Sequence, residues 1–134
     1  MRNTLDLTEP VALMLVFVLH FLSEADDPYR VVAALLDALP SGSLLVLSHG
    51  SYDLIPQSDL ARLTGEDYPG KEDFFARTRA EVTAFFEGLD LLGLPVPADG
   101  TRPRPGLISE WCREPGPAPP GSAVSSWGAV GRKS

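Results

Sequence analysis

The chain has 134 residues, of which 44% are hydrophobic and 22% charged, so it can bury one real core and is typical of a globular protein. Its formal net charge of -7 argues against nucleic-acid binding and against attachment to an anionic membrane. The single cysteine, Cys112, excludes an internal disulfide and a cysteine metal cage, and it favours a reducing, cytoplasmic setting.

The first predicted element is the apolar run at residues 11–19, which gives way to an acidic segment beginning at Glu24. A transmembrane helix needs about 20 apolar residues, and this run is much shorter. A secretory signal needs a basic start, whereas Asp6 and Glu9 precede this run. The run instead fits a strand buried on both faces, as in a parallel sheet with helices on either side.

A helix is expected next, because Asp27-Pro28 places an N-cap acid before a proline at the first helical position. Five apolar residues then follow one stripe of a 3.6-residue period: Val31, Val32, Leu35, Leu36 and Leu39. The sequence "PSGS" ends that helix, and "LLVLS" at residues 44–48 is a second apolar strand. Strand, helix and strand at this spacing form a βαβ unit. The pattern predicts an α/β fold with a parallel sheet.

The pattern weakens beyond Ser48. We expect a short helix near residues 58–63 and a firmer one after the capping box formed by Thr78 and Glu81. Residues 89–96 are compatible with a short strand, and "AVSSWGAVGRK" at the end of the chain predicts the last strand. Residues 95–121 are rich in proline and glycine, which predicts a long surface loop.

Three stretches together resemble a known family. They are "LDLTEPVALMLVFVLHFLSEADDPYRVVAALLDALPSGSLLVLSH", "RTRAEVTAFFEGLDLL" and "WGAVGRK". This combination resembles the S-adenosylmethionine-dependent methyltransferases of actinomycetes, the S-adenosyl methyltransferase or DUF574-type family. The resemblance covers nearly the whole chain outside the Pro-rich loop. It implies a Rossmann-like class I methyltransferase fold and methyl transfer from S-adenosylmethionine to an acceptor that the sequence does not identify.

The resemblance also implies that residues 1–134 correspond to the C-terminal half of such a domain, with strands four to seven and their flanking helices. Class I methyltransferases bind the cofactor with a glycine-rich turn after strand one and an acid that ends strand two, and no segment here matches either feature. A truncated gene, a misplaced start codon or a pseudogene fragment would each explain this. We therefore expect the chain alone to bind S-adenosylmethionine weakly. The alternative is a non-catalytic remnant, or an interaction half-domain that completes its sheet with another chain.

Ligands of open α/β sheets lie at the carboxyl ends of the strands. Leu19, His20 and Phe21 stand at that end of the first predicted strand, and Ser48 and His49 at that end of the second. The resemblance implies that the first group borders the cofactor, with His20 as the candidate catalytic residue. Ser48 and His49 are assigned to the substrate pocket, so that the two histidines would face one cleft.

Each candidate has a simpler alternative. His20 could cap its strand, and His49 is more often a polar strand-end residue than a catalyst. Arg77 and Arg79 could contact an anionic substrate, although a surface role before the helix is favoured. The histidines lack metal-ligand spacing, so no metal site is expected. The remaining candidates are predicted to form a solvated loop and a helix cap: Glu24, Asp26 and Asp27.

The sheet order of the family places the strand at residues 11–19 beside strand one, which has no counterpart here. One edge of this strand would then carry unpaired backbone groups, with no charge or proline inside the run to protect it. The sequence therefore predicts self-association through the edge at residues 11–19, or a partner chain that completes the sheet.

Overall fold

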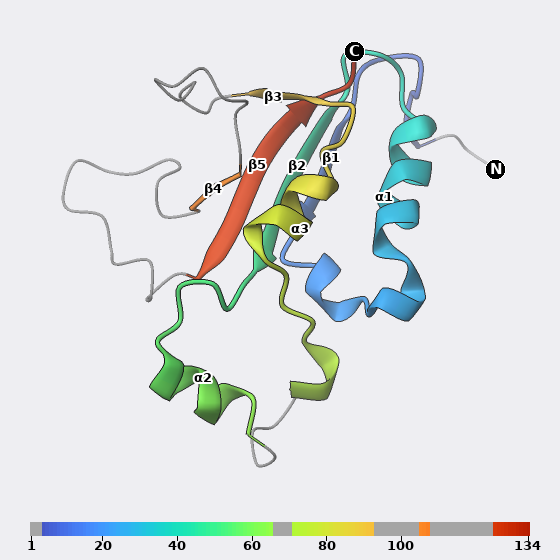
Figure 1. Ribbon diagram of the computed structural model, residues 1–134. Helices are drawn as coiled ribbons and strands as arrows, with labels where there is room; N and C mark the ends of the chain where they lie inside the picture. The colour runs from blue at the N-terminus through green and yellow to red at the C-terminus, as the bar shows by residue number, and fades with distance from the viewer. Residues whose placement is uncertain (1–3, 66–70, 93–104, 108–124) are drawn as a thin grey trace, which may run out of the picture.

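The computed structural model describes residues 4–65, 71–92, 105–107 and 125–134. Helices and strands alternate in the first half of the chain, as expected for an α/β fold (Figure 1). In chain order the elements are β1 (Ala12–Val16), η1 (Leu19–Phe21), η2 (Glu24–Asp26), α1 (Pro28–Asp37), β2 (Leu44–Gly50), α2 (Gln57–Leu63), η3 (Lys71–Asp73), α3 (Arg79–Ala84), β3 (Asp90–Leu92), β4 (Gly106–Leu107) and β5 (Ser126–Arg132).

The strands form one sheet in the order β1-β2-β5-β3, with the short β4 also paired to β5. The predicted βαβ unit is present, since β1 and β2 are parallel neighbours joined through α1. The expectation of a parallel sheet is wrong beyond this unit. β5 runs antiparallel to both β2 and β3, so the sheet is mixed.

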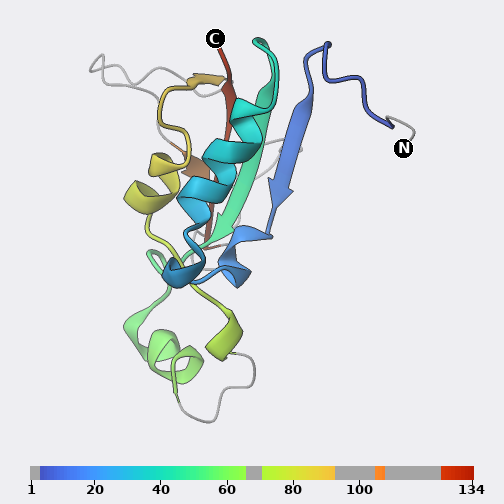
Figure 2. The same cartoon turned by 90° about the vertical axis from the view of Figure 1, so that its right-hand side faces the viewer.

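Helices α1 and α3 cover the same face of the sheet (Figures 1 and 2). Leu45, Leu47 and His49 of β2 point into this covered face, opposite Gly131, Ala129 and Trp127 of β5. The core joins them to buried residues of α1, of α3 and of the turn that follows α3: Val32, Leu36, Val82, Phe85 and Phe86. This covered face contains the hydrophobic core.

The prediction that the first strand is buried on both faces is wrong for the part of the chain that the structure describes. Side chains of β1 alternate between half-buried and exposed, and Met14 is 63% exposed. The half-buried positions, Leu13 and Leu15, pack against the core beneath α1 and α3. No described helix covers the opposite face, so the remaining side chains of β1 face outwards.

Helix α1 begins as its sequence predicts and buries a narrower stripe than expected. Asp27 is the N-cap, and its Oδ1 accepts a hydrogen bond from the Arg30 backbone N–H at 3.3 Å. Val32 and Leu36 are buried, whereas Val31 and Leu35 are about two-fifths exposed. The broad stripe predicted from the sequence is therefore wrong at these two positions, because the helix meets the sheet along a single line.

Helix α3 begins with the predicted capping box. The Glu81 N–H donates to Thr78 Oγ1 at 3.2 Å, and the Thr78 N–H donates to Glu81 Oε2 at 2.7 Å. The turn after α3 lies so close to β5 that a Cβ at Gly131 would stand 2.9 Å from Phe86. A glycine at this position of β5 therefore allows the helix to approach the sheet.

Most of the predicted Pro-rich loop, with Cys112, lies outside the described residues. Gly106 and Leu107, within that range, pair with Gly128 and Trp127 of β5, so the loop prediction is wrong there. The strand expected at residues 89–96 is confirmed over Asp90–Leu92. Within the described ranges, every helix is too short or too polar to cross a membrane.

Candidate functional site

The candidate site lies where β1 and β2 end, at the lower edge of the sheet in Figure 1. Phe17 follows β1 with a positive φ of 52°, and its N–H donates to both the carbonyl and the Oγ of Ser48, each at 3.2 Å. The chain turns there and enters η1. Leu19, His20 and Phe21 thus form a short helix after the strand, whereas the sequence had placed them at the strand end itself. Leu19 and His20 are buried and Phe21 is 61% exposed.

The structure brings the two histidines together, as expected, but both rings are buried and do not open into the predicted common cleft. The ring centroids of His20 and His49 are 5.9 Å apart, and the rings meet edge to face. His20 also contacts Phe21 and Phe74, with centroid distances of 4.4 and 4.8 Å. Burial lowers the pKa of His20, which favours the neutral ring. Its Nδ1 is buried and has no hydrogen-bond partner among the described residues.

His49 is fully buried inside β2, which continues past the predicted end of the strand to Gly50. Its Nδ1 lies 2.7 Å from the Gly50 carbonyl, and its Nε2 lies 2.9 Å from Arg77 Nη1. Since both partners have fixed roles, the proton belongs on Nδ1 and Nε2 accepts from the guanidinium. Burial, together with the nearby charge of Arg77, lowers the pKa of His49 to about 4. Both ring nitrogens are engaged, so His49 is held in place as a neutral ring.

Arg77 is the residue that organises this region, and the surface role favoured from the sequence is wrong. The side chain is 2% exposed. Its Nη1 donates to the Leu19 carbonyl at 3.0 Å, and its Nη2 donates to the Leu22 carbonyl at 2.9 Å. Nη2 also pairs with the exposed carboxylate of Glu24 at 3.1 Å. One guanidinium therefore ties both ends of the η1 turn to His49 at the end of β2.

The acidic segment after η1 has the predicted solvated and capping roles. Asp26 Oδ2 accepts from the Ser23 backbone N–H and hydroxyl, each at 2.8 Å, which closes a capping box around η2. These hydrogen bonds lower the pKa of Asp26. Glu24 contributes to the site only through its ion pair with Arg77.

The loop that leads to Arg77 packs against both η1 and the end of β2. The Phe75 N–H donates to the His20 carbonyl at 2.7 Å, and the Arg77 N–H donates to the Gly50 carbonyl at 3.3 Å. Phe74 packs so tightly on the end of β2 that a Cβ at Gly50 would lie 2.6 Å from its Cζ. Gly50 is therefore needed for this close approach.

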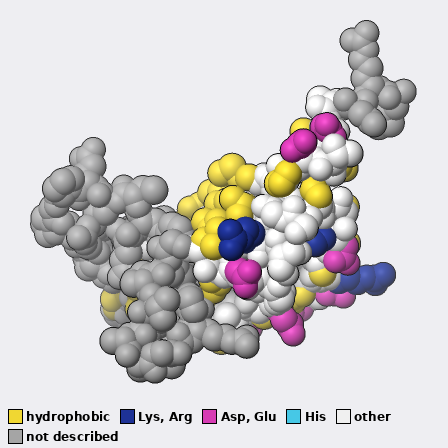
Figure 3. Space-filling view, turned by 90° about the horizontal axis from the view of Figure 1, so that it is seen from above, with side chains coloured by type: hydrophobic (Ala, Val, Ile, Leu, Met, Phe, Trp, Pro, Cys, Tyr) yellow, Lys and Arg dark blue, Asp and Glu magenta, His cyan; other side chains and the backbone are white. Residues whose placement is uncertain are grey.

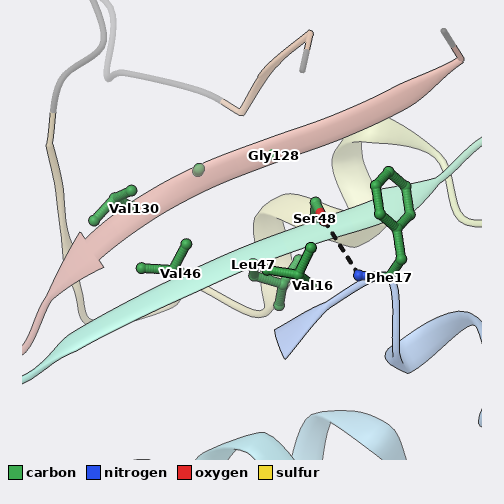
Figure 4. Close-up of a pocket in the computed structure, with 8 residues that line it drawn as sticks. Val16, Phe17, Val46, Leu47, Ser48, Gly128 and Val130 are labelled. Carbon is green, nitrogen blue, oxygen red and sulfur yellow. Dashed lines mark hydrogen bonds between the residues drawn. The ribbon is translucent and has the colours of Figure 1, made fainter. Parts of the chain in front are cut away.

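The structure separates Ser48 from His49, which the sequence analysis had assigned to one substrate pocket. Adjacent residues of a strand point to opposite faces. His49 lies on the covered face, whereas Ser48 lines a hollow of about 200 Å³ on the other face, with Val16, Val46 and Val130 around it (Figure 4). Whether Ser48 or His49 contacts a substrate stays a prediction.

Arg79 makes structural contacts. Its Nε donates to the Pro105 carbonyl at 2.7 Å, and its guanidinium stacks 4.8 Å from the ring centroid of Trp127. Trp127 in turn donates from Nε1 to Asp53 at 2.8 Å. Over the ranges that the structure covers, no three His, Cys, Asp or Glu side chains gather as a metal site would require.

The fold now defines a class. Counted along the chain, the main strands β1, β2, β3 and β5 take the places of strands four to seven, with the reversed last strand inserted before its predecessor. This strand order, with its antiparallel β5, is that of the C-terminal part of a class I methyltransferase fold. The chain belongs to the S-adenosyl methyltransferase family, whose model matches residues 1–134.

Two solved structures are similar over essentially the whole chain. A DUF574 family protein from Streptomyces avermitilis MA-4680 is 33% identical with a TM-score of 0.73, and the match covers 100% of this chain and 48% of that one. A proposed methyltransferase from Thermobifida fusca YX is 31% identical with a TM-score of 0.68, over 98% of this chain and 46% of that one. The chain therefore spans about half the length of these proteins. No curated protein matches it significantly.

Proposed function

We propose that this chain forms the acceptor-side half of an S-adenosylmethionine-dependent methyltransferase domain. The observation that carries the proposal is the η1 turn, which follows β1 at the carboxyl edge of the sheet and holds His20 with a buried Nδ1 that has no partner among the described residues. Ligands of open α/β sheets bind at this edge. The family name implies S-adenosylmethionine as the cofactor.

The residues around η1 fit one end of that cofactor. Phe17 and Phe21 are 40% and 61% exposed, and the faces of aromatic rings attract a cation such as a sulfonium. His20 is favoured as a neutral ring because burial lowers its pKa, so it adds no charge that would repel the sulfonium. Among the described residues, however, we find no glycine-rich turn after a strand for the adenosine end. The residues around η1 therefore fit the methyl-bearing end of S-adenosylmethionine.

The chemistry needs little from side chains beyond placement. S-adenosylmethionine supplies an electrophilic methyl group, and the protein has to align the acceptor with it and exclude water. His20 Nδ1 is buried and unpartnered among the described residues, and a neutral imidazole that an acceptor reaches can take the proton that the acceptor hydroxyl or amine loses. Arg77 positions His20 without contacting the acceptor, because its guanidinium binds the carbonyls of Leu19 and Leu22 on either side of His20.

A non-catalytic half-domain is the second candidate. The observation that supports it is that no glycine-rich turn follows a strand among the described residues. The two candidates agree on the fold and differ in whether a completed domain transfers a methyl group.

Cofactor titration tests how much of the site this chain holds. We expect the isolated chain to bind S-adenosylmethionine weakly or not at all, because the contacts to carboxylate, ribose and adenine lie on segments without a counterpart here. Isothermal titration calorimetry measures this directly. Micromolar affinity of the lone chain would contradict the division of the site into halves, and methyl transfer by the domain completed with a relative's other half would support the proposal.

A further inference from the structure

Phe17 has a backbone conformation that phenylalanine rarely adopts. Its φ is 52°, and among the described residues only one other non-glycine residue, Asp27, has a positive φ. Aspartate tolerates this region because its short side chain can hydrogen-bond locally, whereas a bulky residue there is strained. Strained backbone persists only where the surrounding structure holds it, and it gathers at functional sites. The turn at Phe17 therefore needs a group that holds it.

Ser48 is that group. In the register of the parallel pair it lies beside Val16, the last residue of β1, and it is 5% exposed. Its carbonyl accepts a hydrogen bond from the Phe17 N–H, and its Oγ accepts from the same N–H, each at 3.2 Å (Figure 4). The side chain thus adds a second acceptor at the point where the chain leaves β1. A residue without a hydroxyl at this position would supply only the carbonyl.

The amino end of the same strand pair carries a matched serine. Ser43 is fully buried, and its Oγ accepts a hydrogen bond at 3.1 Å from the N–H of Val11, the residue just before β1. A serine hydroxyl therefore binds the backbone directly outside β1 at each end of the pair. The amino ends of β1 and β2 lie at the top of Figure 1, and both histidines are out of sight in Figure 3, which views the molecule from that side. Ser43 thus makes the equivalent hydrogen bond at the end of the strands away from the candidate site.

The turn at Phe17 determines where His20 lies. η1 begins at Leu19, two residues after Phe17, and the ring centroids of Phe17 and His20 are 6.1 Å apart. Arg77 binds two backbone carbonyls, one in η1 and one at its C-cap. Arg77 therefore fixes η1 itself, and Ser48 fixes the point at which the chain enters it. A change in the backbone at Phe17 would move His20 relative to the sheet.

We propose that Ser48 is a positioning residue for His20, because its Oγ holds the strained turn at Phe17 and so fixes the entry of the chain into η1. Ser48 was assigned to the substrate pocket from the sequence, whereas this role requires no contact with an acceptor or a cofactor. The consequence for methyl transfer rests on the proposed function. The placement of His20 does not depend on it, so the two can be tested separately.

Chemical modification of the histidines tests the proposal in the full chain without cofactor. Diethylpyrocarbonate acylates accessible neutral imidazoles, and mass spectrometry of the digested chain gives separate rates for His20 and His49, the two histidines of the sequence. Both are buried, so both should react slowly in the parent. We expect Ser48→Ala to raise the rate at His20 about tenfold, since losing one buried hydrogen bond favours local opening by about this factor. The rate at His49 should not change.

Three further variants separate this role from a general effect on stability. Ser43→Ala removes the equivalent hydrogen bond at the other end of β1 and should leave the rate at His20 unchanged. Ser48→Thr should restore the parent rate, because threonine keeps the hydroxyl and the hollow of about 200 Å³ beside it has room for a methyl group. Glycine adopts a positive φ without strain, so in a Phe17→Gly background Ser48→Ala should raise the rate at His20 less than about threefold.

Three results would overturn the proposal. The first is an equal rise at His20 and His49 in Ser48→Ala, which would mean that the hydroxyl only stabilises the fold. The second is the same rate at His20 for Ser43→Ala and Ser48→Ala. The third is a Ser48→Thr variant that is folded by circular dichroism and still behaves like Ser48→Ala. If His20 responds as expected but a completed domain transfers no methyl group, the role of Ser48 stands and only the proposed function fails.

Discussion

Arg77 is the residue on which the candidate site depends most. A guanidinium that is 2% exposed is costly to bury, and here two carbonyls, a histidine nitrogen and a carboxylate offset that cost. Its partners come from residues 19–24 and 49, far from it in the sequence. No local pattern around residue 77 indicates this role, and an arginine just before a helix is usually exposed. Sequence reasoning could not have found it without the fold.

His49 makes stability depend on pH. Its pKa is about 4 in the folded chain, against an ordinary value of 6.5, because burial and Arg77 disfavour the charged ring. The unfolded chain therefore binds more protons between these values, and the free energy of unfolding should fall by about 3 kcal/mol as the pH drops from 6.5 to 4. Urea titrations at several pH values measure this slope. His49→Gln should flatten it, and an unchanged slope in that variant would contradict the assignment.

His20 and His49 should differ in their effect on catalysis. In a domain completed with a relative's other half, His20→Ala should lower the methyl-transfer rate by about 100-fold if Nδ1 is the base. His49→Ala should act mainly through stability, since both its ring nitrogens have partners. Initial rates per folded molecule, measured with purified variants at pH 7.5, separate the two effects. Equal and negligible losses would reduce His20 to a structural residue.

The elements were predictable wherever the signal is local. The caps at Asp27 and Thr78 and the βαβ unit depend on residues within a few positions of each other, and the structure confirms them. The width of the buried stripe on α1 could not be predicted from the sequence, because it depends on how the helix packs against the sheet. The pairing of β4 with β5 was likewise hidden, since two residues in a proline-rich segment carry no strand pattern.

The start of α1 gives a test of a single element. Asp27 caps the helix from a left-handed conformation with φ of 48°, which aspartate tolerates and alanine does not. Asp27→Ala removes the capping carboxylate and places alanine at a positive φ, so it should lower the free energy of unfolding by about 2 kcal/mol. Asp27→Gly also removes the carboxylate, but glycine adopts this φ without strain, so the loss should be about 0.5 kcal/mol. Thermal unfolding ranks the two variants. The reverse order would show that the positive φ is not maintained in solution.

At the scale of the molecule, the sequence predicted the arrangement of the sheet better than the site. The apolar runs and their spacing indicate that β1 and β2 are parallel neighbours, whereas the antiparallel direction of β5 was not predicted from the sequence. Which side chains share a face at the carboxyl edge depends on where β1 ends and η1 begins. A shift of a few residues there moves Leu19–Phe21 off the strand, and the alternation of β2 sends Ser48 and His49 to opposite faces.

The behaviour of the chain alone follows from the sheet face opposite α1 and α3, which we call the open face. Among the described residues β1 is an end strand of the sheet and Met14 is 63% exposed, so a second copy of the chain can pair with this edge in more than one register. We therefore expect association without fixed stoichiometry, with an average mass in light scattering that rises with concentration. Val16→Asp should suppress this rise, because a charge beside the edge repels a second copy, and Val31→Asp should not.

The part of the Streptomyces avermitilis relative that lies outside the match is a fragment that should suppress the same association when it is added in equimolar amount, since we expect it to compete for the β1 edge. A monodisperse monomer at all concentrations would mean that residues of the chain itself protect β1, and the open face would then need no partner. If association continues unchanged in the presence of the fragment, the copies associate through another surface. Val31 and Leu35, which are 41% and 42% exposed on the outer side of α1, would be the next positions to substitute.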